Sequence, residues 1–259
     1  MKFSPFWVFS WLAGGLVLLF IGLPLANTLL STPLDNLTAT LSDAEVGRSM
    51  LYTFGGAGLA TLLAVVGGIP LAYLLARTEF PGKRVVEAVV DLPVVIPHTA
   101  AGVALLLVFG RQGMLGKLVQ PLGIHFTDDL NGIVVAMMFV SIPYLVNASR
   151  ESFRMVDAEM ERVAMIDGAS PWQAFWLVTL PQAWRGVLGG MLMMWARGIS
   201  EFGAVVILAY HPKVVPVLVF ERFQGYGLDS AQPVAVILII VVLVVFSLLR
   251  TVLMRPEKP

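Results

Sequence analysis

Residues 230–249 read SAQPVAVILIIVVLVVFSLL, and Ser247 is the single polar residue after Pro233 in this stretch. A helix rises about 1.5 Å per residue, so about 20 apolar residues cross the hydrocarbon core of a bilayer. The stretch therefore predicts a membrane-spanning helix. Of the 259 residues, 58% are hydrophobic and 13% are charged. Soluble globular proteins are about 45–50% apolar and about 25% charged, so we expect the surplus apolar surface to face lipid.

Five other long stretches carry few or no charges, and with the first they predict six membrane spans. We expect the spans at about residues 6–30, 49–76, 90–110, 130–149, 186–209 and 231–250. Residues 168–184 are also uncharged, but Pro171 and Pro181 would each cost a helix about 3 kcal/mol, so this segment is expected at the membrane surface. The first span is too long for a signal peptide. The sequence thus predicts one all-α integral membrane domain over residues 1–259.

The distribution of basic residues predicts the orientation in the membrane. Six spans place both termini on the same side, together with loops 77–91 and 150–185. This side carries 11 Lys and Arg residues, including Lys2, Arg255 and Lys258, and the opposite side carries 5. Because cytoplasmic segments of membrane proteins are enriched in Lys and Arg, we expect a multi-pass protein of the cytoplasmic (inner) membrane with both termini in the cytoplasm.

Composition and motifs argue against several classes of function. The net charge is zero, whereas proteins that bind nucleic acid are normally basic, so we expect no nucleic-acid partner. There is no cysteine, and His98, His125 and His211 lie in different segments, so we expect no metal site. The sequence also lacks a phosphate-binding Gly-x-x-x-x-Gly-Lys-Ser/Thr loop and a Gly-x-Ser-x-Gly motif. We therefore predict no catalytic residues and no enzyme activity in this chain.

The loop at 150–185 is unusually long, because connections between helices in bundles usually take about 2–8 residues. Residues 157–169 read DAEMERVAMIDGA and predict a short helix. Acidic residues lie near its start, where they suit the helix dipole, and Gly168 is placed to end it. Ser170 and Pro171 can start a second short helix. We expect both helices at the cytoplasmic membrane surface.

This loop resembles the cytoplasmic loop of type I ABC-importer permeases. The family pattern is Glu-Ala-Ala, three residues, Gly, nine residues, then Ile-x-Leu-Pro. Here Arg162-Val163-Ala164, Gly168 and Val178-Thr179-Leu180-Pro181 occur at those spacings, and Arg162 departs from the usual glutamate. The resemblance implies a six-span permease fold whose first loop helix is a coupling helix that binds a groove of an ATPase subunit. The glycine turn is expected where a side chain would clash. The implied coupling residues are Glu159, Arg162, Val163, Ala164, Asp167, Gly168, Ala169, Leu180 and Pro181.

Two other segments resemble the oxyanion branch of the same family. Residues 196–204, ARGISEFGA, are similar to the fifth-span signature of permeases for molybdate, tungstate, sulfate and thiosulfate, and residues 93–102, PVVIPHTAAG, resemble their third span. The resemblance implies transport of molybdate or tungstate, with sulfate or thiosulfate as the alternative. It also implies ATPase subunits that carry ATP and Mg²⁺, an extracytoplasmic substrate-binding protein and a second copy of the chain. No cofactor is expected on this chain itself.

Charged residues within the predicted fifth span are candidates for the translocation pathway. Arg197 and Glu201 are four residues apart, so they can pair on one face of a helix. Such a pair could steady the bundle, or it could border the pathway or a hinge. His98, which follows Pro97, could line the pathway or only pack. The candidate pathway or hinge residues are His98, Arg197, Glu201 and Gly203. An ion-coupled secondary transporter is a further alternative, but the internal repeats common in that class are not visible in the sequence.

Overall fold

The computed structural model describes residues 4–253, and all regular secondary structure within that range is helical. The first six helices are α1 (Pro5–Leu30), α2 (Leu34–Leu41), α3 (Ala44–Arg77), α4 (Lys83–Val95), α5 (His98–Phe109) and α6 (Met114–Val119). The others are α7 (Leu130–Met155), α8 (Ala158–Ile166), α9 (Pro171–Ala174), α10 (Leu180–Ile199), α11 (Gly203–Leu208), α12 (Val215–Tyr226) and α13 (Leu228–Leu253). A 3₁₀ turn at Gln120–Leu122 follows α6, and a π-helical turn at Phe175–Thr179 joins α9 to α10. Lys2, Arg255 and Lys258, which entered the predicted orientation, lie outside the described residues.

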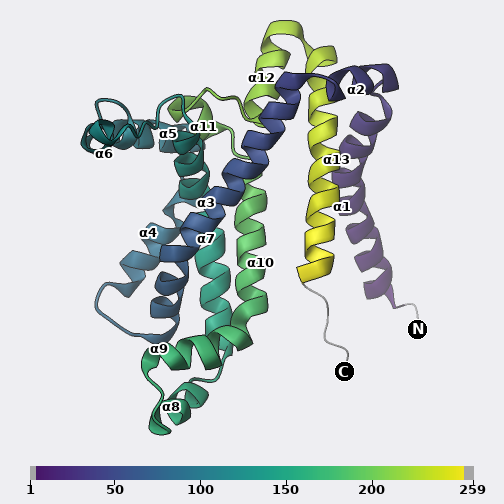
Figure 1. Ribbon diagram of the computed structural model, residues 1–259. Helices are drawn as coiled ribbons and strands as arrows, with labels where there is room; N and C mark the ends of the chain where they lie inside the picture. The colour runs from purple at the N-terminus through teal and green to yellow at the C-terminus, as the bar shows by residue number, and fades with distance from the viewer. Residues whose placement is uncertain (1–3, 254–259) are drawn as a thin grey trace.

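The centre of the molecule is a bundle of α3, α7 and α10, which run side by side (Figure 1). Small residues allow this close packing, because lipid provides no hydrophobic drive between helices. A Cβ added to Gly190 on α10 would lie 2.9 Å from the Ala148 Cβ on α7. One added to Gly186 would overlap Ser152, which is also on α7. These glycines therefore serve packing within the chain, and α7 is the most buried of the long helices.

Five segments of the described chain are helical, long and apolar enough to cross a membrane. They are residues 5–30, 44–77, 98–122, 130–155 and 228–251. The predicted fifth span, residues 186–209, is divided, because α10 ends at Ile199 and α11 begins at Gly203. The expectation of one continuous helix there is wrong. Its physical cause is Glu201, whose buried carboxylate accepts a hydrogen bond from the Ala204 N–H beyond the break, at 2.9 Å.

The predicted span at 90–110 is also interrupted, between α4 and α5. Pro97 lacks a backbone N–H, and the residue before a proline favours an extended backbone. Ile96 accordingly has φ −74° and ψ 146° and ends α4. The two breaks lie next to each other, because α11 packs along α5. The fold therefore brings together the interrupted parts of two predicted spans.

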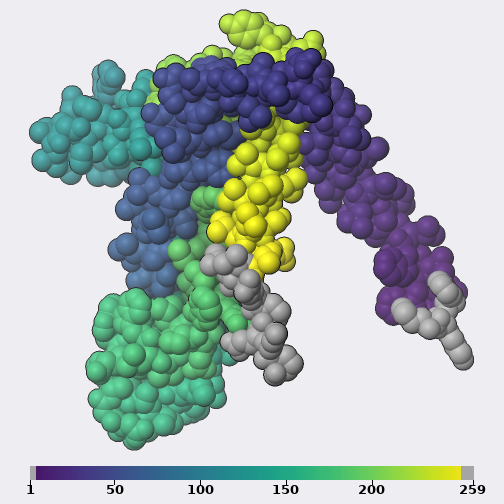
Figure 2. Space-filling view, turned by 45° about the vertical axis from the view of Figure 1, so that its right-hand side comes forward, coloured from purple at the N-terminus to yellow at the C-terminus, as the bar shows by residue number. Residues whose placement is uncertain are grey.

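The α8–α9 lobe and the α2–α12 region lie at opposite ends of the molecule (Figures 1 and 2). Figure 2 also shows α1 diverging from the rest of the chain as an arm. No residue of α1 is buried. The Gln232 side chain links α1 to α13, because its amide donates to the Thr28 carbonyl on α1 at 3.2 Å and to Ser31 Oγ and Thr32 Oγ1, just beyond α1, at 2.8 Å. An apolar helix this exposed requires lipid or another protein surface around it.

Ionic contacts, which we call the outer network, connect α12 and the segment before it to the start of α3. Lys213 Nζ lies 2.6 Å from Glu221 Oε1 and 3.0 Å from Glu45 Oε1. Arg222 pairs with the Asp43 carboxylate, which also caps α3. The hydrogen bond from Arg222 holds the pKa of Asp43 below its usual value. The network joins the N-terminus of α3 to α12 and to the segment before it.

Candidate functional site

The helix expected over residues 157–169 is present as α8, and local interactions define both of its ends. The Asp157 carboxylate accepts a hydrogen bond from the Glu159 N–H at 2.9 Å and caps the N-terminus. At the other end the Gly168 N–H donates to the Met165 carbonyl, and the Ala169 N–H donates to the Ala164 carbonyl at 2.9 Å. This pair of bonds is the Schellman motif. The second helix begins at Pro171, and Ser170 and Gln173 form a capping box at its start.

Gly168 is required for a different reason from the one expected. A Cβ added to it would meet nothing within 4 Å, so the expected steric clash is absent. Its φ is instead +99°, a left-handed conformation that residues with a Cβ adopt at a cost of about 1–2 kcal/mol. The glycine therefore allows the tight turn between α8 and α9 through its backbone freedom.

One face of α8 is apolar and exposed. Met160, Val163 and Ile166 follow at three-residue spacing, which places them on one face, and Val163 and Ile166 are 55% and 83% exposed. Arg162 lies beside this face and pairs with Glu159 at 2.8 Å. Large apolar side chains exposed together on a helix outside the bundle indicate a surface that another molecule covers.

The nine predicted coupling residues fall into two groups. Glu159, Arg162, Val163 and Ala164 are on α8, and Asp167, Gly168 and Ala169 form the turn that ends it. Leu180 and Pro181 are not part of this surface, because they start α10. Leu180 packs against an apolar cluster that includes Leu75, Phe153 and Phe175, at the junction between the lobe and the bundle.

Glu161 was not among the predicted coupling residues, yet its carboxylate accepts hydrogen bonds from Tyr73, Arg77 and Thr179, on other elements. It is 6% exposed on a helix whose other long side chains are exposed. Its Oε1 accepts from Arg77 Nη2 at 2.7 Å and from Thr179 Oγ1 at 2.6 Å. Its Oε2 accepts from the Tyr73 hydroxyl at 2.9 Å. Burial opposes ionisation, but these hydrogen bonds outweigh it and hold the pKa of Glu161 below its usual value.

A second group of charged side chains lies where the two predicted spans are interrupted. Glu201 is fully buried, and its Oε2 lies 3.0 Å from Arg197 Nη2 and 2.9 Å from His98 Nδ1. The oxygen is held at ion-pair distance rather than by aligned hydrogen bonds. The expected Arg197–Glu201 pairing is therefore present, but the two residues do not share a helix face, because α10 ends between them.

The four candidate pathway residues are close together. His98 is the first residue of α5 and Gly203 is the first residue of α11. A Cβ on Gly203 would lie 2.8 Å from the His98 Cβ, so the glycine allows the two helix starts to approach. Arg197 and His98 are partly exposed, whereas Glu201 lies behind them. The arrangement offers two nitrogen-bearing side chains at a surface, neutralised by a buried carboxylate.

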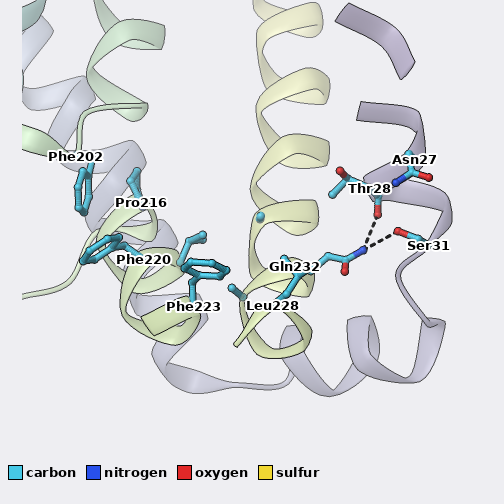
Figure 3. A pocket seen from close by; sticks show the side chains of 12 residues that line it. Asn27, Thr28, Ser31, Phe202, Pro216, Phe220, Phe223, Leu228 and Gln232 are labelled. Carbon is cyan, nitrogen blue, oxygen red and sulfur yellow. Dashed lines mark hydrogen bonds between the residues drawn. The ribbon is translucent and has the colours of Figure 1, made fainter. Parts of the chain in front are cut away.

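A cavity of about 440 Å³ adjoins this cluster, between α12 and the α1–α13 pair (Figure 3). Phe202, the residue after Glu201, lines it together with Phe220, and their ring centroids are 4.9 Å apart. Thr28, Ser31 and Gln232 form its polar side. Among the described residues we find no group of His, Asp and Glu side chains that could hold a metal ion.

Comparison with known proteins gives a consistent family assignment. Residues 68–255 match the family described as "Binding-protein-dependent transport system inner membrane component". The chain is 40% identical over 239 residues to the molybdate/tungstate transport system permease protein WtpB of Thermococcus kodakarensis, with 92% of each chain covered. It is 30% identical to a probable sulfate transport system permease protein, cysT, of Zygnema circumcarinatum, with 94% of this chain and 86% of the relative covered.

Solved structures show the same fold at low sequence identity. The crystal structure of a bacterial ABC transporter that imports the acidic polysaccharide alginate is 17% identical, with a TM-score of 0.74. The match covers 98% of this chain and 96% of that one. A further structure of an alginate ABC transporter, in complex with a periplasmic protein, has the same TM-score at 16% identity, with 95% and 93% covered. The all-helical fold is thus that of type I ABC-importer permeases.

Proposed function

The chain belongs to the family of inner membrane components of binding-protein-dependent transport systems, and from this premise we propose that it is the permease subunit of an ATP-driven importer of molybdate or tungstate. The observation that carries the proposal is the α8 lobe, a short capped helix that presents an exposed apolar face outside a bundle of apolar helices. The substrate class rests on the relative that is 40% identical over 92% of both chains. Sulfate is the second candidate, because the chain is 30% identical to a sulfate permease protein over most of its length.

The face of α8 that includes Val163 and Ile166 binds a cytoplasmic ATPase subunit, and Glu159, Arg162 and Asp167 border this contact. ATP and Mg²⁺ bind on the ATPase, and the permease itself carries out no chemical step. Two copies of the chain form the pathway, and an extracytoplasmic binding protein delivers the anion at the end that carries the outer network. This arrangement places the α8–α9 lobe and both termini in the cytoplasm. ATP binding then shifts the population between conformations open to either side.

The cluster of His98, Arg197 and Glu201 borders the pathway of the anion. A free arginine in a membrane interior would attract an oxyanion strongly, because charges interact more strongly where the dielectric constant is low. Glu201 neutralises Arg197 at 3.0 Å, so the anion meets hydrogen-bond donors without a net positive charge that would trap it. Because the cluster joins two interrupted helices, its geometry changes when these helices move.

The test is reconstitution of the permease with its ATPase subunit and binding protein in proteoliposomes. We expect ATP-dependent uptake of molybdate or tungstate that persists when the proton gradient is dissipated. Preference for sulfate would support the second candidate. Uptake that needs the proton gradient and no ATP would overturn the proposal in favour of an ion-coupled transporter.

The contact with the ATPase is tested separately by Ile166→Glu. This substitution places a charge on the exposed apolar face of α8, and we expect it to abolish co-purification of the ATPase from detergent while the permease still enters the membrane. Leu34→Glu is the matched control, because Leu34 is exposed on α2, at the opposite end of the molecule from the lobe and outside the five apolar segments. Undiminished co-purification of the Ile166→Glu variant would contradict the assignment of α8.

A further inference from the structure

The connection between α8 and the membrane bundle depends on one buried carboxylate. By backbone proximity α8 packs chiefly against α9 and the π-helical turn. Within residues 4–253, the recorded hydrogen bonds and ion pairs that link an α8 side chain to a membrane-spanning helix are those of Glu161 with Tyr73 and Arg77 on α3. Arg77 Nη2 also donates to the Val156 carbonyl at 2.9 Å. The same guanidinium therefore contacts both α8 and the turn that precedes it.

The neighbours of Glu161 are themselves held rigidly. The Tyr73 ring packs edge to face against Phe153 and Phe175, with centroids 5.7 Å and 4.9 Å away. Thr179 is fully buried at the end of the π-helical turn, and π-helical turns occur frequently at functional sites. The carboxylate of Glu161 thus joins α8 to α3 and to the start of α10 at a single point.

We propose that Glu161 is a positioning residue that fixes the direction of α8 relative to α3, so that displacement of α8 moves α3 rather than tilting α8 alone. The inference rests on the proposed function, because it assumes that a partner moves α8. An isolated nine-residue helix is only marginally stable in water, and without a fixed attachment it would absorb displacement by reorienting. α3 then extends about 50 Å from this attachment to the outer network at Asp43.

The buried charges explain why a neutral replacement would weaken this attachment. Removing one partner of a buried ion pair leaves the other charge uncompensated, which is strongly destabilising. In Glu161→Gln, the Arg77 guanidinium would lose its counterion, and α8 would adopt a range of orientations. Glu79 offers a matched control, because it forms an ion pair of similar length with Lys83, at 2.6 Å, in the neighbouring loop, but its side chain is 88% exposed.

The experiment compares transport with ATP hydrolysis in the reconstituted complex of permease, ATPase and binding protein, with molybdate and tungstate as probes. For Glu161→Gln we expect ATP hydrolysis within about twofold of wild type and anion transported per ATP lowered by about fivefold or more, since one to two kcal/mol corresponds to a factor of about 5–30. Glu79→Gln should retain the wild-type ratio. A variant that only misfolds would yield less complex, which lowers transport and ATP hydrolysis in proportion and leaves their ratio unchanged.

A second measurement reports the orientation of α8 directly. The chain has no cysteine, so spin labels can be attached to Cys introduced at Leu74 on α3 and Met165 on α8, both of which are exposed. We expect a narrow distance distribution in the wild-type background and a broad one with Glu161→Gln. If that variant does not assemble, Tyr73→Phe removes one hydrogen bond and keeps the aromatic packing, and it should broaden the distribution less.

Equal transport per ATP in Glu161→Gln and wild type, measured at matched amounts of assembled complex, or equally narrow distances, would overturn the positioning role while leaving the proposed function intact. Failure of the wild-type complex to hydrolyse ATP or to transport either anion would instead refute the proposed function. A lowered ratio in Glu79→Gln of the same size would also contradict the inference, because it would show that any carboxylate near the lobe has this effect.

Discussion

At the scale of single residues, the role of Gly168 follows from its backbone conformation, and the role of Glu201 follows from its buried charge. Gly168 has a φ of +99° in the turn that ends α8. Because the space around it is open, the cost of a side chain there comes from the backbone alone. Glu201 is instead fixed by its surroundings, since a fully buried carboxylate requires cationic or hydrogen-bonding partners.

Gly168→Ala is expected to loosen the C-terminus of α8 by about 1–2 kcal/mol, the cost of a left-handed conformation for a residue with a Cβ. Amide hydrogen exchange over residues 158–166 should become about 5–30 times faster. Gly225→Ala is the control, because Gly225 lies within α12 with open space around its Cβ position. Unchanged exchange in α8 of Gly168→Ala would show that the turn does not depend on glycine.

Glu201→Ala is expected to impair transport more than membrane insertion. Without its carboxylate, Arg197 would retain an uncompensated charge beside the break between α10 and α11, and uptake should fall about tenfold or more, which corresponds to 1.4 kcal/mol. Uptake is measured at matched permease abundance, with the exposed Glu151→Gln as control. Normal uptake at wild-type abundance would show that the ion pair serves packing alone.

At the scale of elements, the outer network predicts a defined pH dependence. Hydrogen bonds from Arg222 and Lys213 lower the pKa values of Asp43 and Glu221, and the bond to Glu221 raises the pKa of Lys213. A carboxylate whose pKa is lowered in the folded protein adds stability, which is lost as the pH falls through that lowered pKa. A lysine whose pKa is raised in the folded protein adds stability, which is lost as the pH rises through that raised pKa. Asp43, Glu221 and Lys213 therefore stay ionised between about pH 5 and 10.

The measurable consequence concerns Asp43→Asn. The difference in melting temperature between this variant and wild type should stay constant from about pH 5.5 to 9 and shrink as the pH falls towards 4 and below, where an unfolded aspartate becomes protonated. Thermal unfolding of the purified permease checks this. A difference that already disappears near pH 6 would show that Asp43 is not held in its ionised form.

At the scale of the whole molecule, the exposed arm α1 and the proposed function together predict a dimer. No residue of α1 is buried within the chain, so lipid or another protein surface covers it, and the proposed function predicts that a second copy covers part of it. Two copies with different affinity tags, co-expressed with the ATPase, should therefore purify together. Recovery of one tag only, from an active complex, would contradict the dimer.

The sequence predicted the class of fold well, because long apolar stretches have few alternatives to membrane-spanning helices. It did not predict the break at 200–202, since Ser200, Glu201 and Phe202 lack a proline or another strong local break signal. The break depends on the position of the Glu201 carboxylate, which accepts from the Ala204 N–H and lies 2.9 Å from His98 Nδ1, on a helix distant in the sequence. The break at Ile96 was foreseeable in principle, because Pro97 follows it.

The sequence also predicted those parts of the candidate site that depend on interactions between residues close in the chain. The capped ends of α8 depend on nearby residues such as Asp157 and Gly168, and they follow from the sequence. Glu161 was missed because its partners on α3 are 84 and 88 residues away in the chain. A local signal did exist, since Ala158 and Ala164, three residues to either side, give that face small side chains that allow close approach.

The π-helical turn at Phe175–Thr179 widens the helix where the α8–α9 lobe joins α10. A π turn closes one full turn with about one residue more than an α-helical turn, so it admits the extra residue without rotating the helices on either side of it. Deleting Leu177 is therefore expected to return this segment to regular α-helix and to leave the lobe at nearly its present rotation about α10. The effect would be confined to the wider turn itself, where Thr179 Oγ1 donates to Glu161 Oε1 at 2.6 Å.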